Sequence, residues 1–302
     1  MMANTGVVPA DSLTGIRIAY ETFGDPADAP VLLVMGLGGQ LLGWREGFCA
    51  ALASRGHFVI RYDNRDVGLS THLQDASEPD FDAITRGDLS SVSYTLSDMA
   101  GDAVRLLDGL GVEAAHVVGM SMGAMVAQTL AVEHPTRVRT LTSVMSTTGD
   151  PTVGESSEAV RALLFGPPST GRDEAIEDDV RARRVTGSPD YPTDEDELRA
   201  HAAQAFDRAF DPGGVARQLA AIVASGDRTP RLEGVTVPTL VIHGAQDPLV
   251  GLSGGRATAA AIGGAELVVI DGMGHDLPTA LWPDIIDRIS LLVERADERA
   301  AG

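Results

Sequence analysis

The sequence contains no lysine, so all 23 of its basic side chains are arginines. This absence excludes enzymes that form a Schiff base or an internal pyridoxal aldimine, and it excludes the phosphate-loop lysine of nucleotide hydrolases. The single cysteine, Cys49, excludes an intrachain disulfide and a cysteine-based zinc cluster. It lies in the helix-like stretch GFCAALAS, where we expect a buried apolar side chain. Serine, histidine and carboxylate chemistry remain.

Long apolar runs and positive charge are also scarce. The longest apolar runs, such as residues 31–35, are too short to cross a bilayer. The first residues, MMANTGVVPADS, show neither the basic start nor the apolar core of a secretory signal, so we expect a cytoplasmic protein. A net charge of −20 at pH 7 repels nucleic acids and anionic membranes. We therefore expect neither as a partner, and both a monomer and a homodimer stay open.

Short β-rich runs alternate with helix-like segments along the chain. This alternation predicts an α/β fold in which crossover helices connect mostly parallel strands. The predicted strands are residues 16–20, 31–35, 58–63, 116–120, 141–145, 239–244 and 266–271.

The alternation breaks between about residues 148 and 234. This stretch has no strand-like run, two breaks rich in proline and glycine, and several acidic helix-like pieces. The acidic residues 194–197 indicate the solvated first turn of a helix. We therefore predict a core made of residues 1–147 and 235–302, with residues 148–234 as a helical insertion over the sheet.

Two serines stand between glycines in G-x-S-x-G spacing, Ser121 in GMSMG and Ser253 in GLSGG. A nucleophile in this pattern needs a strand before it and a helix after it, because the sharp turn strains the serine and leaves no room for side chains two residues away. Ser121 has the strand-like AHVV before it and the helix-like AMVAQTLAVEH after it. Ser253 follows a loop containing Pro248, so we interpret it as a helix N-cap.

A serine hydroxyl needs an oriented base before it can act as a nucleophile. Of the 7 histidines, His275 lies in a glycine-rich loop after the last predicted strand, where ligand-facing loops gather. His243 lies inside a predicted strand and is expected to be packed, and His201 is expected to be solvated. Asp247, just beyond a strand, completes the chain order Ser, Asp, His that this kind of sheet favours. The rival acids are Asp150, Asp271 and Asp276.

The tetrahedral intermediate of acyl transfer also needs two N–H donors for its oxyanion. The residue after the nucleophile, Met122, supplies one, and Leu37 in the segment MGLGG is the candidate for the other. Gly36 and Gly38 let this backbone approach a substrate closely. A dinucleotide-binding loop is the alternative, but its pattern needs a glycine where Leu41 stands.

The chain resembles the α/β-hydrolase superfamily over essentially its whole length. The resemblance lies in the motifs MGLGG, RYDNRDVGLS, GMSMG, HGAQDPLV and GMGHDLP. It implies that Ser121 is the nucleophile, His275 the general base and then acid, and Asp247 the carboxylate that orients it. It also implies that Leu37 and Met122 bind the oxyanion and that the insertion is a helical cap.

The sequence departs from the family pattern at two places. The family usually has histidine where Met35 stands and glycine where Asp66 stands. Within the superfamily the chain is similar to actinobacterial serine carboxylesterases of the aclacinomycin methylesterase type.

That similarity implies hydrolysis of a carboxylic ester through an acyl-enzyme, with no metal and no organic cofactor. A methylesterase acting on a polyketide-like or other small hydrophobic ester is one form of this activity. A lactonase, thioesterase, perhydrolase or carbon–carbon bond hydrolase stays open, because each uses the same triad, and so does a non-catalytic ligand-binding receptor that has kept it. The candidate pocket residues are Gly36, Gly38, Phe165, Tyr191, Phe206 and Phe210. For the four aromatic residues the alternative is packing within the cap, which is the commoner role of a buried ring.

Overall fold

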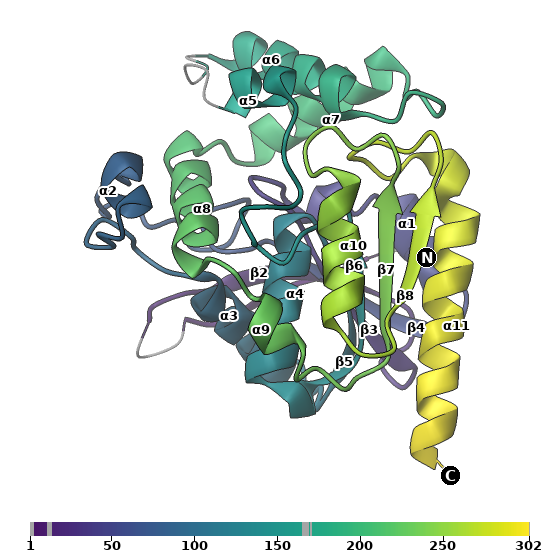
Figure 1. Ribbon diagram of the computed structural model, residues 1–302. Helices are drawn as coiled ribbons and strands as arrows, with labels where there is room; N and C mark the ends of the chain where they lie inside the picture. Colours follow the sequence, from purple (N-terminus) through teal and green to yellow (C-terminus); the bar gives the residue numbers. More distant parts are fainter. Residues whose placement is uncertain (1–2, 11–13, 165–168, 170, 302) are drawn as a thin grey trace.

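The computed structural model describes residues 3–301 apart from 11–13, 165–168 and 170 (Figure 1). In this part of the chain, eight strands form one sheet in the order β1-β2-β4-β3-β5-β6-β7-β8. The strands are β1 Asn4–Val8, β2 Ile18–Phe23, β3 Ala29–Val34, β4 His57–Tyr62, β5 Ala115–Met120, β6 Val138–Val144, β7 Thr239–Gly244 and β8 Glu266–Ile270. β2 runs antiparallel to β1 and β4, and the other neighbours are parallel. The predicted mostly parallel sheet is confirmed, with β1 as an additional strand.

Helices connect the strands along the described residues. They are α1 Glu46–Ala53, α2 Phe81–Thr85, α3 Leu96–Gly109, α4 Met122–Glu133, α5 Glu158–Leu164, α6 Arg172–Thr186, α7 Glu195–Arg208, α8 Pro212–Ser225, α9 Thr229–Leu232, α10 Leu252–Ala261 and α11 Trp282–Ala301. None of these described helices combines the length and the apolar character that crossing a bilayer requires.

Most residues of the central strands are buried because helices cover both faces of the sheet. On β3, Val31 and Leu33 pack into a cluster that includes side chains of α1 and α11. The alternate residues Leu32 and Val34 pack into a second cluster with side chains of α3 and α4. All of these strand side chains are fully buried. Alternate side chains of a strand point to opposite faces of the sheet, so one apolar run contributes to the two clusters on both sides.

The chain between β6 and β7 holds helices α5–α9 and, within its described residues, no strand. Figure 1 shows α5, α6 and α7 together beyond the ends of the β7 and β8 arrows, with α8 running back along the core. As predicted, α7 begins at the acidic run, where the Asp194 carboxylate accepts hydrogen bonds from the amides of Asp196 and Glu197. The division into residues 1–147, 148–234 and 235–302 stays a prediction.

Candidate active site

The candidate catalytic residues come together at the edge of the sheet where parallel strands end. Ser121 follows β5 directly, Asp247 follows β7, and His275 follows β8. The segment that contains Gly36 and Leu37 follows β3. Ligand sites of open α/β sheets form outside the carboxyl ends of the strands. The topology alone therefore brings distant parts of the sequence to one place.

Ser121 lies at a strained bend between β5 and α4. Its backbone has φ 57° and ψ −123°, a conformation that is costly for a residue with a side chain. A Cβ atom at Gly119 would lie 2.3 Å from the carbonyl oxygen of Gly123, and one at Gly123 would lie 2.1 Å from that of Val34. Both flanking positions therefore need glycine, because strand and helix pass too close for any side chain.

The strained backbone is held by the end of strand β6. The Ser121 amide donates to the carbonyl oxygen of Val144 at 2.9 Å. The Ser121 carbonyl oxygen accepts a hydrogen bond from Oγ of Ser146 at 2.8 Å. The surrounding core thus fixes the peptide groups on both sides of the serine.

A chain of hydrogen bonds joins the three predicted side chains. His275 Nε2 lies 3.0 Å from Ser121 Oγ, and His275 Nδ1 lies 2.7 Å from Asp247 Oδ2. The other Asp247 oxygen accepts from the amides of Leu249 and Val250, each at 2.9 Å. The Asp247 carboxylate is fully buried, so it holds the imidazole in one orientation. Such an arrangement can remove a proton from the serine hydroxyl.

The second G-x-S-x-G pattern serves packing. Ser253 lies within α10, whose N-cap is Gly251, so the predicted N-cap role is wrong. Its Oγ accepts a hydrogen bond from the amide of Gly154 at 2.9 Å. A Cβ atom at Gly255 would lie 2.4 Å from Nδ1 of His243. Position 255 therefore needs glycine because α10 passes close to β7.

His243 and His201 are both buried. The His243 ring lies 2.8 Å from the carbonyl oxygen of Val250, and burial lowers its pKa, so the ring adds no positive charge beside Asp247. The expectation that His201 is solvated is wrong. The face of α7 that carries His201 packs against the loop after β3, and the imidazole ring lies 3.2 Å from the carbonyl oxygen of Leu42. Burial lowers the pKa of His201 to about 4.

The rival acid Asp276 points to a different partner. Its carboxylate accepts a hydrogen bond from the Ser188 hydroxyl, and burial raises its pKa. Among the described contacts of the His275 ring, the bonded carboxylate is that of Asp247. The adjacency of His275 and Asp276 in sequence therefore does not make them a pair.

A tight turn at residues 36–39 carries the second candidate oxyanion donor. The Gly39 amide donates to the carbonyl oxygen of Gly36 at 3.1 Å, and Gly38 has φ 66°. A Cβ atom at Gly36 would lie 3.1 Å from Cβ of Ser121, so the turn begins against the serine. Within the described residues, neither the Leu37 amide nor the Met122 amide donates a hydrogen bond. Both N–H groups are thus available to a ligand.

The aromatic pocket candidates lie between β6 and β7. Phe206 and Phe210 stack with ring centroids 4.7 Å apart, and 47% of Phe210 is exposed. Tyr191 lines a cavity of about 170 Å³ together with residues 192–194, 197 and 278–280. Phe165 lies outside the described residues. Whether these rings contact a substrate stays a prediction.

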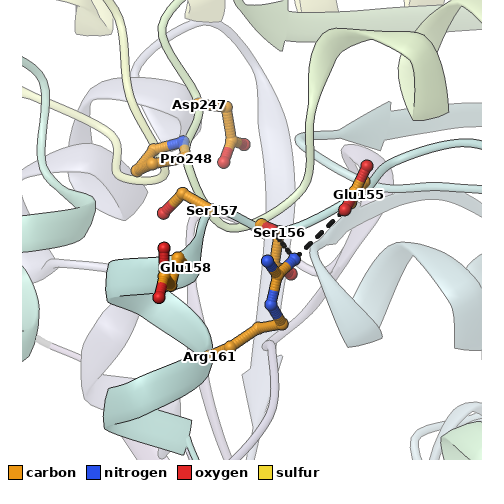
Figure 2. Close-up of a pocket in the computed structure, with 7 residues that line it drawn as sticks. All are labelled: Glu155, Ser156, Ser157, Glu158, Arg161, Asp247 and Pro248. Atoms are coloured by element: carbon orange, nitrogen blue, oxygen red, sulfur yellow. Dashed lines mark hydrogen bonds and ion pairs between the residues drawn. The ribbon is translucent and has the colours of Figure 1, made fainter.

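A larger cavity of about 340 Å³ lies against Asp247 and Pro248 (Figure 2). Its remaining lining consists of residues 155–158 and Arg161, whose guanidinium is paired with Glu155 (Figure 2). Small-molecule pockets are mostly apolar, whereas this lining is mostly charged and hydroxylic. Ser121 and His275 are not part of it. We therefore do not assign this cavity to the substrate.

Comparison with known proteins agrees with the geometry. A family model described as alpha/beta hydrolase fold matches residues 29–278. The chain belongs to this family. It is 34% identical to the rhodomycin D methylesterase DnrP of Streptomyces peucetius over 88% of this chain and 91% of that protein. A hydrolase from Pseudomonas aeruginosa PA01 is similar in structure, with a TM-score of 0.71 and 25% identity over 96% of this chain and 98% of that one. The enol-lactonase from Burkholderia xenovorans LB400 shares the fold, with a TM-score of 0.72 and 24% identity over 93% of this chain and 97% of that one.

The two departures from the α/β-hydrolase pattern have structural explanations. Met35 places its side chain against the turn, 2.8 Å from where a Cβ of Gly39 would lie. Asp66 has φ 68°, the left-handed conformation that suits glycine and that aspartate also tolerates. The Asp66 carboxylate is buried and accepts hydrogen bonds from the Tyr94 hydroxyl at 2.8 Å and from the Arg217 guanidinium at 2.9 and 2.8 Å.

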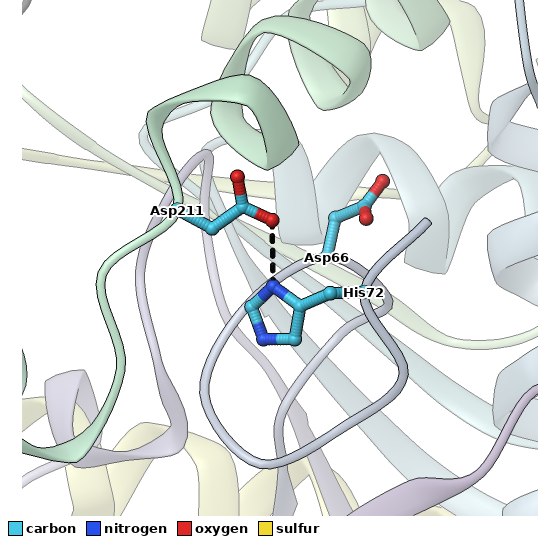
Figure 3. A group of neighbouring side chains, drawn as sticks. All are labelled: Asp66, His72 and Asp211. Carbon is cyan, nitrogen blue, oxygen red and sulfur yellow. Dashed lines mark hydrogen bonds and ion pairs between the residues drawn. The ribbon is translucent and has the colours of Figure 1, made fainter. Parts of the chain in front are cut away.

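Asp66, His72 and Asp211 cluster around this ion pair (Figure 3). Arg217 also contacts Asp211 at 3.3 Å, so a cation that entered the cluster would have to displace the guanidinium. Figure 3 shows the His72 ring bonded to Asp211, and the distance is 2.7 Å. The cluster joins the loop after β4 to the start of α8, and we interpret it as an ionic contact between these two parts of the chain.

The sequence does not predict the contacts by which the segment between β6 and β7 holds the site. Gln218 on α8 accepts a hydrogen bond from the Gly38 amide at 2.9 Å. The His275 amide donates to the carbonyl oxygen of Thr186 at 2.7 Å, and Ser188 Oγ accepts from the Gly274 amide at 2.9 Å. No local pattern indicates these partners, because each lies far from the site in sequence.

Proposed function

We propose that this protein is a serine hydrolase that cleaves a carboxylic ester through an acyl-enzyme on Ser121. The observation that carries the proposal is the hydrogen-bonded chain from Ser121 Oγ through His275 to the buried Asp247. The bend that exposes the serine after a strand is the feature that this chemistry requires.

In the proposed mechanism, Ser121 Oγ attacks the ester carbonyl while His275 Nε2 takes its proton. The carboxylate of Asp247 keeps the proton on Nδ1 and stabilises the imidazolium that forms. The protonated His275 then donates to the departing alcohol. A water molecule, activated by the same nitrogen, hydrolyses the acyl-enzyme and restores the serine.

Negative charge develops on the carbonyl oxygen in both transition states. The amides of Leu37 and Met122 supply the proposed donors, since neither donates elsewhere among the described residues. Backbone donors that need no reorganisation stabilise the transition state more than the substrate, and removing one typically costs about 10²- to 10³-fold in turnover.

We propose a small hydrophobic ester as substrate, with a polyketide-like methyl ester as the first candidate. The similarity to a rhodomycin D methylesterase over most of both chains supports this choice. Lactones and thioesters pass through the same tetrahedral intermediate, so the test uses a panel graded by acyl size, alcohol size and leaving atom.

The test compares two serines that share the same spacing. With a chromogenic short-chain ester, we expect Ser121→Ala to reduce kcat by about 10³-fold or more, and Ser253→Ala to leave it within a few fold. A fluorophosphonate should label Ser121, as read by peptide mass spectrometry. Wild-type protein that binds esters without turnover, or a Ser121→Ala variant with near-normal rates, would refute the assignment and favour a binding protein or another nucleophile.

A further inference from the structure

Gln218 is a buried polar residue of the inserted segment that contacts the turn at residues 36–39. Its side chain is completely buried on α8. Its Oε1 accepts from the Gly38 amide at 2.9 Å, and its Nε2 donates to the carbonyl oxygen of Arg65 at 2.8 Å. One amide group therefore ties the turn after β3 to the loop after β4, and both of these bonds are to backbone.

Gln218 bonds the central peptide of the turn, between Leu37 and Gly38, which makes no hydrogen bond within the turn itself. The Gly39 amide bonds the Gly36 carbonyl oxygen, which closes the turn, and a positive φ at Gly38 is the signature of a type II turn. Type I and type II turns differ by the orientation of the central peptide, here the one between Leu37 and Gly38. By accepting from the Gly38 amide, Gln218 stabilises one of these two orientations.

The position of Gln218 is itself fixed. One residue earlier, Arg217 pairs with the buried Asp66, and Val215 packs against the turn 3.1 Å from where a Cβ of Gly38 would lie. Two residues of α8 near Gln218 are thus anchored to the core or packed on the turn. The amide of Gln218 therefore acts from a rigid helix rather than from a loop.

We propose that Gln218 is a positioning residue that holds the turn at residues 36–39 in the place where the Leu37 N–H can bind the oxyanion. The inference rests on the proposed function. The Leu37 N–H belongs to the neighbouring peptide, between Gly36 and Leu37, and its place beside Ser121 depends on where the whole turn sits. In the absence of the Gln218 amide, the turn loses its tie to α8 and to the loop after β4, it shifts relative to Ser121, and the fraction of enzyme with a competent turn decreases. Because the donor acts on the oxyanion and not on the ground-state ester, the loss appears in kcat while KM changes little.

The test uses Gln218→Met, which keeps the length of the side chain and removes both hydrogen bonds. We expect kcat to fall about 10- to 100-fold, less than or equal to the loss of one oxyanion donor, with KM within about 3-fold. A trifluoromethyl ketone, which forms a tetrahedral oxyanion on Ser121, should bind more weakly by a similar factor. A purely structural role would lower the melting temperature, but it would not weaken binding of the ketone more than binding of the substrate.

Gln128→Met is the matched control. Gln128 is also completely buried and bonded at both ends, to Ser143 at 3.4 Å and to Arg228 at 3.2 Å, and neither bond touches the turn. We expect a similar loss of stability with kcat within about 3-fold of wild type. Equal losses of kcat in both variants would overturn the proposal.

Gln218→Glu provides the rescue. A carboxyl group keeps an acceptor for the Gly38 amide and, when protonated, a donor for the Arg65 carbonyl, so kcat should lie between those of wild type and Gln218→Met. The proposal is wrong if Gln218→Met keeps the wild-type kcat and ketone affinity, or if Gln218→Glu is as impaired as Gln218→Met. These failures leave the Ser121→Ala result unchanged, so they are distinguishable from failure of the proposed function.

Discussion

The substitution Asp247→Asn tests the proposed role of the buried carboxylate with almost no change in shape. One oxygen of Asp247 accepts from the amides of Leu249 and Val250, each at 2.9 Å, and the other bonds His275 Nδ1 at 2.7 Å. An asparagine must keep its oxygen toward the two amides, because the opposite orientation would set its NH₂ against two N–H donors. Its NH₂ therefore faces His275.

This orientation forces the wrong tautomer on the imidazole. Nδ1 must then accept a hydrogen bond, so the proton moves to Nε2, which faces Ser121 Oγ and can no longer act as a base. A wrong tautomer of this kind costs about 10⁴ in kcat in a serine protease, equivalent to about 5 kcal/mol of transition-state stabilisation. We expect a loss of this order, measured with a chromogenic ester. Stability should change by only about 1 kcal/mol, because both backbone amides keep an acceptor.

Two further variants complete the experiment. Asp247→Ala leaves the amides of Leu249 and Val250 unpaired, so the free energy of unfolding should fall by about 2–6 kcal/mol in addition to the loss of kcat. Asp276→Asn changes the neighbouring buried carboxyl, which bonds Ser188, and should keep kcat within a few fold. If Asp247→Asn kept a kcat within 10-fold of wild type, or if Asp276→Asn were the damaging change, the reasoning from hydrogen-bond direction would be refuted.

Two predictions concern stability. Gly123→Ala would place a Cβ 2.1 Å from the backbone oxygen of Val34, so its free energy of unfolding, measured by chemical denaturation, should fall by about 3 kcal/mol or more. Gly101→Ala on α3 has open space around its Cβ and should raise the free energy of unfolding by about 0.5–1 kcal/mol. Equal effects of the two substitutions would contradict this reasoning. Both ring nitrogens of His72 face acceptors, Asp211 at 2.7 Å and the Gly68 carbonyl oxygen at 2.9 Å. Burial lowers the pKa of His72, but these bonds outweigh it and raise the pKa above its usual value. Because the pKa is higher in the folded state, protonated His72 stabilises the fold fully below the unfolded-state pKa of about 6.5, and this stability is lost as the pH rises through the folded-state pKa. The melting temperature of His72→Gln should therefore lie furthest below that of the wild type in mild acid. A difference in melting temperature that widened with rising pH would be inconsistent with a charged His72.

The strands and the three site side chains could be predicted from sequence because each leaves a local signal. A strand covered on both faces reads as a continuous apolar run, and the G-x-S-x-G bend and the Asp247 turn follow such strands. The His275 loop follows the apolar run of β8, which lies at the edge of the sheet and is partly exposed. Strand β1 leaves no such signal. Its residues are mostly exposed or half-buried at the edge of the sheet, where only β2 pairs with it.

The errors have physical causes too. The acidic residues around His201 favour a solvated side chain. However, Leu198, His201 and Ala202 are all buried on α7 and follow the i, i+3, i+4 spacing of a helix face. That spacing was a usable signal. The contact of Gln218 with Gly38 joins residues 180 positions apart and depends on how α8 packs, so no local pattern could indicate it.

Two parts of the chain support the site. The end of β6 and the residues just after it hold the strained Ser121, through Val144 and Ser146. The segment between β6 and β7 holds the two loops that must meet the serine, at Gln218 for the turn after β3 and at Thr186 for the His275 loop. A segment that only covered the pocket would affect which esters enter, and thus KM. Because this one bonds the backbone of both loops, substitution of Gln218, whose side chain makes the contact with the turn, should also change kcat, even for the smallest ester that needs no pocket.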